Sequence, residues 1–340
     1  MLRLFGILFT VLFAIATAVL VWPQFFQLEM AFPIAQIVAW RAFVLIGFVV
    51  IVVLALLMLI ARPLRGFAAS LLIVALIGAG ATGFVGATRG FGTGSLPEKT
   101  DAALRVLTWN TNGAAVSAER IAAVIAEQKV DIVALPETSE KVGEQIAIRM
   151  REAGDPMWVH HVNIRPDVKN GPQAWQTTIL ISAKLGEYSV IASSRDGSSN
   201  TSSVPSAVAM PVDGSGPTIV AVHAVAPRQD AMERWRSDLA WIADQCPAGD
   251  FILAGDFNAT LDHMSSLRDD GGTMGRCHDA ASSTGNGMMG TWPASVPALL
   301  STPIDHVMAS ENWRATGSEV LDDAGGSDHR ALVVQLEPAG

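Results

Sequence analysis

Three long apolar runs open the chain and restrict its first ninety residues to helices. Residues 4–22, 42–61 and 67–87 are each close to 20 residues long, and the second and third contain no charged residue. That length lets a helix cross a hydrocarbon core of roughly 30 Å. In lipid, backbone polar groups must be hydrogen-bonded within their own segment, so such runs form helices. Buried core helices are the alternative, but a water-soluble domain rarely needs three such runs so close together. We expect three transmembrane helices within residues 1–89.

Basic residues around these runs predict how the chain crosses the membrane. The first run has features of a signal peptide, because Arg3 precedes it and residues 14–18 offer small-residue cleavage patterns. The apolar stretch continues beyond them and two more spans follow, so we expect an uncleaved helix. Arg62 and Arg65, between the second and third spans, predict a cytoplasmic loop. Arg3 agrees with this orientation and Arg41 opposes it. We therefore expect an integral protein of the cell membrane with its C-terminal domain outside the cytoplasm.

Composition changes after residue 89. Residues 90–102 are rich in Gly, Ser and Pro and predict a flexible linker, and residues 103–340 have the composition and length of one globular domain. Residues 101–340 contain 17 Lys and Arg against 30 Asp and Glu, a net charge of −13. Domains that bind DNA non-specifically are usually basic, so this balance argues against a general DNA-binding nuclease. Metal ions and local patches can outweigh net charge.

Strands and helices alternate through the C-terminal domain. Many strands with few helices predict an α/β fold with two sheets packed face to face and helices outside. Polar stretches predict loops at 193–203 and 269–290. Cys246 and Cys277 are the two cysteines, and the sequence leaves open whether they form a disulfide or remain two thiols. Apolar runs predict strands at 104–110, 130–135, 175–182, 206–211, 218–224, 251–254, 305–309 and 330–336, and helical spacing or composition predicts helices at 118–128, 141–152 and 228–245.

Polar residues stand at the ends of several of these strands. A scaffold holds carboxylates, amides and imidazoles rigidly at such positions, which suits a site for a metal and a phosphate. Asp and Asn oxygens favour a hard cation such as Mg²⁺, Mn²⁺ or Ca²⁺, whereas zinc would call for Cys or clustered His ligands. The short sequences involved are Trp109-Asn110, Pro136-Glu137, a strand ending in His223, Gly255–Asn258 (GDFN), Ile304–His306 (IDH) and Ser327–His329 (SDH).

These six elements, in this order, resemble the endonuclease/exonuclease/phosphatase superfamily. That superfamily includes secreted DNases (DNase I-like proteins), abasic-site endonucleases, neutral sphingomyelinases and inositol-polyphosphate phosphatases. The resemblance covers roughly residues 103–337. It implies a four-layered α/β sandwich, in which two mixed sheets are flanked by helices and the active site lies at one end of the paired sheets. It also implies hydrolysis of a phosphate ester by water with the help of a divalent metal.

The resemblance implies a set of metal-binding residues. Glu137 matches the principal metal carboxylate, and Asn110 matches an Asn that positions the metal or the phosphate. Asn112 stands where several family nucleases carry Asp, which leaves a second acidic metal position open. The full expected metal set is Asn110, Glu137, Asp256, Asn258 and Asp328.

The resemblance also implies catalytic roles. His329 would orient or deprotonate the attacking water, or stabilise charge on the phosphate, with Asp305 fixing its tautomer. His223 would protonate the leaving oxygen or bind phosphate, and Asp256 and Asn258 would contact the scissile phosphate. By strand alternation, His306 points away from Asp305 and is assigned to packing.

The sequence thus predicts a membrane-anchored phosphoesterase that hydrolyses a phosphodiester or phosphomonoester. The expected cofactor is Mg²⁺ or Mn²⁺, with Ca²⁺ as an alternative. The expected partners are the lipid bilayer, through residues 1–89, and a phosphoester substrate, which is a phospholipid head group, a small phosphoester or a nucleic acid. No protein partner is inferred. The alternatives are an extracytoplasmic endo- or exonuclease acting on DNA or RNA, and a catalytically inactive binding protein of the same fold, which the full set of site residues disfavours.

Overall fold

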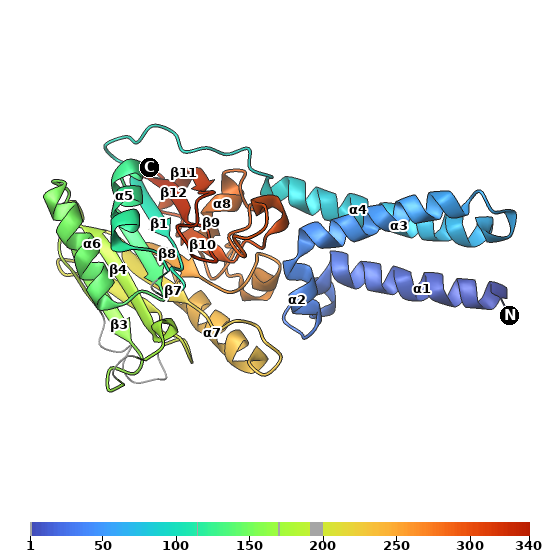
Figure 1. Ribbon diagram of the computed structural model, residues 1–340, viewed down its shortest axis with the longest axis horizontal. Helices are drawn as coiled ribbons and strands as arrows, with labels where there is room; N and C mark the ends of the chain where they lie inside the picture. Colours follow the sequence, from blue (N-terminus) through green and yellow to red (C-terminus); the bar gives the residue numbers. More distant parts are fainter. Residues whose placement is uncertain (1, 114, 169–170, 191–199) are drawn as a thin grey trace. The chain divides into compact units, whose positions relative to one another are not determined.

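The chain divides into two compact units in the computed structural model. The N-terminal unit comprises Met1–Thr88 and the C-terminal unit comprises Arg89–Gly340. The structure describes residues 2–113, 115–168, 171–190 and 200–340 (Figure 1). The predicted loop at 193–203 lies largely outside these described residues.

The N-terminal unit contains three helices that are long and apolar enough to cross a membrane, in agreement with the three predicted spans. Their side chains meet through aromatic rings, with ring centroids 5.8 Å apart for Phe9 and Phe67 and 6.4 Å apart for Phe13 and Phe48. Arg41, whose charge opposed the predicted orientation, is buried in this unit rather than exposed in a loop. The helices are α1 (Leu2–Val21), α3 (Arg41–Met58) and α4 (Arg65–Arg89), joined through η1 (Pro23–Phe26), α2 (Ile34–Ala39) and η2 (Arg62–Leu64).

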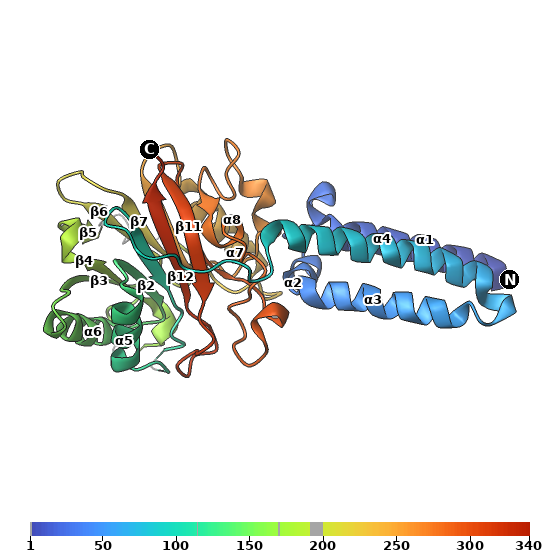
Figure 2. The ribbon, with the colours of Figure 1, turned by 90° about the horizontal axis from the view of Figure 1, so that it is seen from above.

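The C-terminal unit consists of two mixed six-stranded sheets packed together, with flanking helices, as predicted (Figure 2). The first sheet has the order β11-β12-β1-β2-β4-β3 and the second has the order β5-β6-β7-β8-β10-β9. Their strands are β1 (Leu104–Thr108), β2 (Ile132–Pro136), β3 (Met157–Asn163), β4 (Gln176–Ser182), β11 (Trp313–Val320) and β12 (Leu332–Pro338) in the first sheet, and β5 (Tyr188–Val190), β6 (Ala207–Pro211), β7 (Thr218–His223), β8 (Phe251–Asp256), β9 (His278–Asp279) and β10 (Asp305–Ala309) in the second.

Two apolar clusters hold the layers together. The cluster between the sheets joins residues such as Ile132 and Ile179 of the first sheet to Ile219 and Ile252 of the second. The other cluster packs the outer face of the first sheet against α5 (Ala118–Gln128) and α6 (Glu140–Glu152). Serines cap both helices, because Ser117 and Ser139 accept a hydrogen bond from the backbone three residues later. Alternate residues of the strands in the first sheet therefore pack into two different apolar clusters.

Each sheet contains one parallel strand pair joined through a helix. Strand β1 pairs with β2 across α5, and β7 pairs with β8 across α7 (Met232–Asp244), while the remaining pairs are antiparallel. The carboxyl ends of parallel neighbours meet at one edge of a sheet, which is where ligands bind in many α/β folds. Asn110, Glu137, His223 and Asp256 stand at or just beyond these four ends.

Among the described residues of the C-terminal unit, the sequence missed four strands and one α-helix. All four strands lie at sheet edges: β3 and β11 are the outer strands of the first sheet, and β5 and β9 are those of the second. Strand β11 also has a β-bulge between Ala315 and Gly317. Such strands carry polar residues on their less buried face and lack a clean alternation. The segment expected to be one long loop, 269–290, contains β9, the short helix α8 (Ala280–Ser283) and the bridges beside them.

The two cysteines form a disulfide, which the sequence left open. Cys246 and Cys277 have Cα atoms 5.8 Å apart and enclose a sequence separation of 31 residues. Closing a loop of this length removes entropy from the unfolded chain equivalent to about 3–4 kcal/mol. We expect dithiothreitol to lower the free energy of unfolding of the C-terminal unit by this amount, measured in urea. A Cys246→Ser/Cys277→Ser variant should be equally destabilised and insensitive to dithiothreitol, whereas an unchanged wild-type midpoint would contradict the bridge.

Candidate active site

Three of the predicted site residues form a row across neighbouring strands of the second sheet. His223 of β7 is paired in register with Asp256 of β8, and Asp256 is paired with Asp305 of β10. Residues in register on adjacent strands point to the same side of a sheet, so strand pairing alone brings these three side chains together. All three are buried.

Gly255 lets β7 and β8 approach at this row. It has φ 155°, and a Cβ atom there would lie 2.0 Å from the carbonyl oxygen of Val222. Only glycine fits a contact this close. Gly255 therefore allows the two backbones to approach closely, and Asp256, which follows it, provides the side chain of the candidate site.

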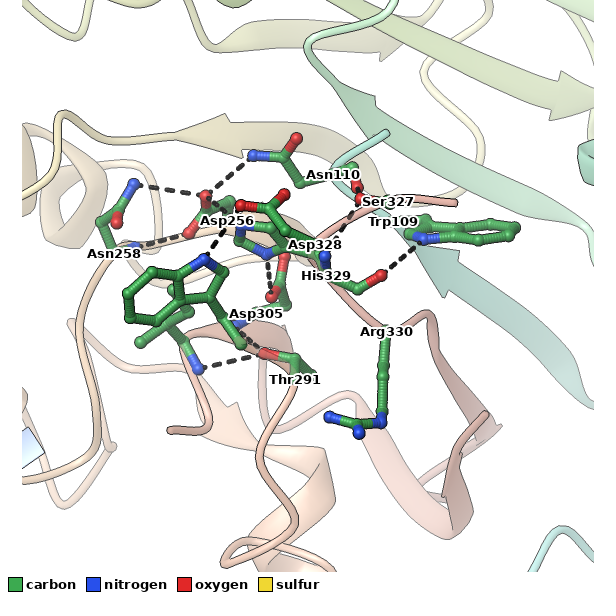
Figure 3. Close-up of polar contacts among 12 residues, drawn as sticks. Trp109, Asn110, Asp256, Asn258, Thr291, Asp305, Ser327, Asp328, His329 and Arg330 are labelled. Atoms are coloured by element: carbon green, nitrogen blue, oxygen red, sulfur yellow. Dashed lines mark hydrogen bonds and ion pairs between the residues drawn. The ribbon is translucent and has the colours of Figure 1, made fainter. Parts of the chain in front are cut away.

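Asn110 joins the first sheet to this row. Its Nδ2 donates a hydrogen bond to Asp256 Oδ2 at 3.0 Å (Figure 3). The same nitrogen also donates to Glu137 Oε1 at 3.2 Å. Its Oδ1 accepts from the backbone N–H of Asn112 at 3.0 Å. Glu137 has φ 58°, a left-handed conformation that is uncommon for residues other than glycine. Strain of this kind concentrates at functional sites.

His329 is held between two carboxylates. Its Nδ1 lies 2.8 Å from Asp305 Oδ2, and its Nε2 lies 3.8 Å from Asp256 Oδ2. The Ser327 hydroxyl donates to the carbonyl of Asn110 at 2.7 Å and accepts from the backbone N–H of His329 at 3.0 Å. Trp109 donates from its indole to the carbonyl of His329 at 3.0 Å. Two first-sheet residues thus fix the loop that carries His329 against the second sheet (Figure 3).

The charges in this cluster perturb one another. Burial alone would lower the pKa of His329, but the carboxylates of Asp305 and Asp256 outweigh it and raise the pKa to about 10. Burial and the nearby Asp305 charge raise the pKa of Asp256. Burial likewise raises the pKa of Glu137. The carboxyl groups of Glu137, Asp256 and Asp305 therefore lie close together in one site, and the positive charge near them is too small to balance three negative charges.

His223 is neutral in this environment. Burial, reinforced by the charge of His329, lowers its pKa to about 3. Its Nε2 lies 3.8 Å from Glu137 Oε1, and its buried Nδ1 has no hydrogen-bond partner among the described residues. A neutral imidazole can present either ring nitrogen to a substrate as donor or acceptor.

The remaining predicted residues border the cluster. Asn258 donates from its side chain to the carbonyl of Ala224 at 2.9 Å and to Asp256 Oδ2 at 3.2 Å. Asp328 is exposed, and its Oδ2 accepts a hydrogen bond from the Trp292 indole at 3.1 Å. All eight predicted site residues are therefore brought together or placed at the border of the cluster. Their assigned roles stay predictions.

Two further residues border the site, and Thr291 is one that the sequence did not predict. Thr291 accepts, through its hydroxyl, hydrogen bonds from the backbone N–H groups of Asp305 at 3.2 Å and Ile304 at 3.3 Å. Trp292 contacts Asp328 as described. Thr291 lies in a segment without apolar periodicity, so no local pattern could have identified it. His306, assigned to packing, is buried between Asp279 Oδ2 at 2.8 Å and the carbonyl of Ala259 at 2.9 Å.

The donor atoms suit a hard divalent cation. Ligand atoms of Asp256, Asp305 and His329 lie within 4.8 Å of one another. Among the described residues, the ion pairs of Glu137, Asp256 and Asp305 are all with histidines. Asp305 Oδ1 is buried without a hydrogen-bond partner in the described part of the chain. Buried carboxylates in this state need compensating positive charge, and oxygen donors favour Mg²⁺, Mn²⁺ or Ca²⁺.

Comparisons with known proteins agree with this fold. No curated protein matches the sequence. Similar solved structures include an endonuclease/exonuclease/phosphatase from Beutenbergia cavernae DSM 12333, with 19% identity over 70% of this chain and 72% of that chain and a TM-score of 0.50. Humanized D. rerio TDP2 with 14 mutations has 15% identity over 70% of this chain and 100% of that chain, with a TM-score of 0.52. D. rerio TDP2 complexed with single strand DNA product has 16% identity over the same shares, with a TM-score of 0.50.

At these identities the structural likeness shows the fold alone. The family model described as the endonuclease/exonuclease/phosphatase family, however, matches residues 107–329 of the sequence, which is most of the C-terminal unit and more than half of the chain. That match spans every site residue from Asn110 to His329. The chain therefore belongs to the endonuclease/exonuclease/phosphatase family.

Proposed function

We propose that this protein is a membrane-anchored phosphoesterase that hydrolyses a lipid head group or another small phosphate ester with the help of a divalent metal. The proposal rests on the arrangement of His223, Asp256 and Asp305 in one row across the second sheet, with His329 next to Asp305 and Asp256. The family is typically metal-dependent, and this chain has the buried acidic and histidine cluster that such chemistry uses. The three apolar helices support the membrane anchor.

Glu137 and Asp256 are the residues that we assign to hold the metal. One amide nitrogen, Nδ2 of Asn110, donates to both carboxylates and keeps them facing each other. Asp305 and His329 already satisfy each other through a 2.8 Å hydrogen bond, so we assign them to proton chemistry although their atoms lie close enough to ligate. Asp328 at the border is a further candidate ligand. When bound, the metal would polarise a phosphoryl oxygen and stabilise the leaving oxyanion.

The histidines then have separate tasks. Asp305 fixes Nδ1 of His329, which leaves Nε2 directed toward Asp256 and the substrate side. That nitrogen orients the attacking water or donates to a phosphoryl oxygen. His223, neutral and buried, hydrogen-bonds to the phosphate or to the leaving oxygen. Water attacks phosphorus directly, and no side chain of the cluster acts as a covalent nucleophile.

The disulfide supports the predicted orientation across the membrane. Disulfides persist in oxidising compartments and are rare in the cytosol. Cys246 and Cys277 both belong to the C-terminal unit, so their bridge favours an extracytoplasmic location for that unit. The same orientation follows from Arg62 and Arg65 in the connection between the second and third spans.

A nuclease is the second candidate function. It is favoured by the structure of D. rerio TDP2 complexed with single strand DNA product, which shares the fold. The net charge of −13 over residues 101–340 opposes it, because a nuclease must bring a polyanion to its site. We therefore rank a nucleic-acid substrate below a small or lipid phosphoester.

The full-length chain, purified in detergent with Mg²⁺ or Mn²⁺, tests this proposal. It should hydrolyse bis-p-nitrophenyl phosphate or members of a phospholipid panel and leave plasmid DNA intact. DNA cleavage that is lost in a His329→Ala variant would establish the nuclease instead. Hydrolysis of none of these substrates with either metal would contradict the assignment as a phosphoesterase.

A further inference from the structure

The residues expected to begin a flexible linker are bound to the C-terminal unit. The backbone N–H of Gly287 donates to the carbonyl of Arg89 at 2.8 Å, and that of Met288 donates to Gly90 at 3.0 Å. In return, the N–H groups of Gly92 and Thr93 donate to the carbonyl of Gly285 at 3.1 and 3.3 Å. We call residues 89–93 the strap. Figure 2 shows the chain continuing from there across β11 and β12 before it enters β1.

A buried ion pair fixes the first residue of the strap. The Arg89 guanidinium donates two hydrogen bonds to the Asp262 carboxylate, at 2.9 and 2.7 Å. The side chain of Asp262 is 2% exposed and that of Arg89 is 17% exposed. A fork of two parallel bonds sets both direction and distance, and a buried carboxylate tolerates the loss of its partner poorly. Arg89 is therefore anchored within the C-terminal unit, of which it is the first residue.

The strap is connected to the candidate active site through the loop that it binds. Residues 285–288 lead directly to Thr291, whose hydroxyl accepts the backbone N–H of Asp305. Gly287, Thr291 and Asp305 line the same small cavity. Asn286 is held from the other side, because its Nδ2 donates to the carbonyl of Ser318 at 2.7 Å. A shift of the strap would therefore move the backbone of Asp305, which orients His329.

We propose that the strap is a positioning element of the active site, in which Arg89 and Gly90 hold the 285–291 loop so that Asp305 can align His329. This inference rests on the proposed hydrolytic function. The hydrogen bonds of Arg89 and Gly90 in the described part of the chain go to Asp262, Gly287 and Met288 rather than to the reacting groups, so each acts through Thr291 and Asp305. Mispositioning of a reacting group by about 1 Å can cost up to about 100-fold in rate.

Gly90 offers a test with a matched control. Gly90 has φ 85°, and a Cβ atom there would lie 2.2 Å from the backbone of Gly285. Gly154, at the end of α6, has φ 88° and no atom within 4 Å of the same position. Gly90→Ala and Gly154→Ala therefore carry a similar backbone cost, and only the first displaces the strap. Arg89→Gln provides a second disruption that introduces no steric clash.

The full-length variants in detergent are compared by steady-state kinetics and by amide hydrogen exchange of peptides covering 285–305. We expect Gly90→Ala and Arg89→Gln to lower kcat about tenfold with KM little changed and to accelerate exchange, while Gly154→Ala resembles the wild type. If amide exchange becomes faster while kcat stays unchanged, the strap is only a structural contact, and its positioning role is overturned. Equal exchange in both alanine variants would overturn the contact itself. If the wild type hydrolyses no ester, the proposed function fails, and exchange still decides whether the strap controls the loop.

Discussion

Replacement of His329 by Ala is expected to lower kcat for phosphoester hydrolysis by about 10³-fold, the range in which positioned acid–base groups contribute. His329 lies between Asp305 and Asp256 at the point where the two sheets meet. No other described residue pairs with both carboxylates in this way, so a neighbouring group cannot take its place. The rate is measured with bis-p-nitrophenyl phosphate at saturating Mg²⁺ on the full-length chain.

The chain supplies a matched control for this variant. His306 is also buried, and it also lies 2.8 Å from a buried carboxylate, that of Asp279. Its Nε2 lies 2.9 Å from the carbonyl oxygen of Ala259, so this nitrogen is not directed into the site. His306→Ala should therefore lose comparable stability in thermal unfolding and keep most of its kcat while folded. An equal loss of kcat in both variants would mean that the His329 effect arises from damage to the fold.

Replacement of Glu137 by Gln is expected to raise the Mg²⁺ concentration needed for half-maximal activity by at least tenfold, roughly the smallest loss seen when metal-site partners are removed. Burial already raises the pKa of this carboxyl, and a bound cation is the natural source of compensating charge. The neutral amide keeps the shape of the side chain and removes its charge. Mg²⁺ should also raise the thermal unfolding temperature of the wild type more than that of the variant.

Glu140→Gln is the control for this experiment. Glu140 stands three residues further along the chain, is exposed and begins α6. Its replacement makes the same change in net charge outside the cluster, so the Mg²⁺ dependence should match that of the wild type. If Glu137→Gln also responds to Mg²⁺ as the wild type does, the metal is held elsewhere in the cluster.

Strong local patterns made much of the fold predictable. The helix expected at 118–128 and the strand expected at 305–309 have these bounds in the structure, because each is a run of helical or strand periodicity with a clear end. Edge strands such as β3 and β11 escaped notice, since their stability comes from pairing with a neighbour rather than from their own apolar pattern. The Gly-rich composition of 90–102 suggested flexibility, but hydrogen bonds from 285–288 fix its beginning. Composition therefore predicts the flexibility of a segment only when no other part of the chain binds that segment.

The candidate site was predictable in its residues and not in its geometry. The order of the short sequences, through its resemblance to the family, predicted the eight residues, most of which stand at or next to the ends of strands that the sequence predicts. Register between β7, β8 and β10 places His223, Asp256 and Asp305 in one row, and register depends on pairings across the whole domain. Thr291 acts through contacts with the backbone of Ile304 and Asp305, 13 and 14 residues further along the chain, so only the folded chain reveals it.

We propose that this chain hydrolyses phosphate esters through a divalent metal bound at Glu137 and Asp256. The most direct measurement is a titration of Mg²⁺ into the metal-free, full-length chain while hydrolysis of bis-p-nitrophenyl phosphate is followed. We expect no hydrolysis without metal and a saturable rise in rate that EDTA reverses. Hydrolysis that persists in EDTA, or the absence of hydrolysis of both this ester and the phospholipid panel at every Mg²⁺ and Mn²⁺ concentration, would contradict this proposal.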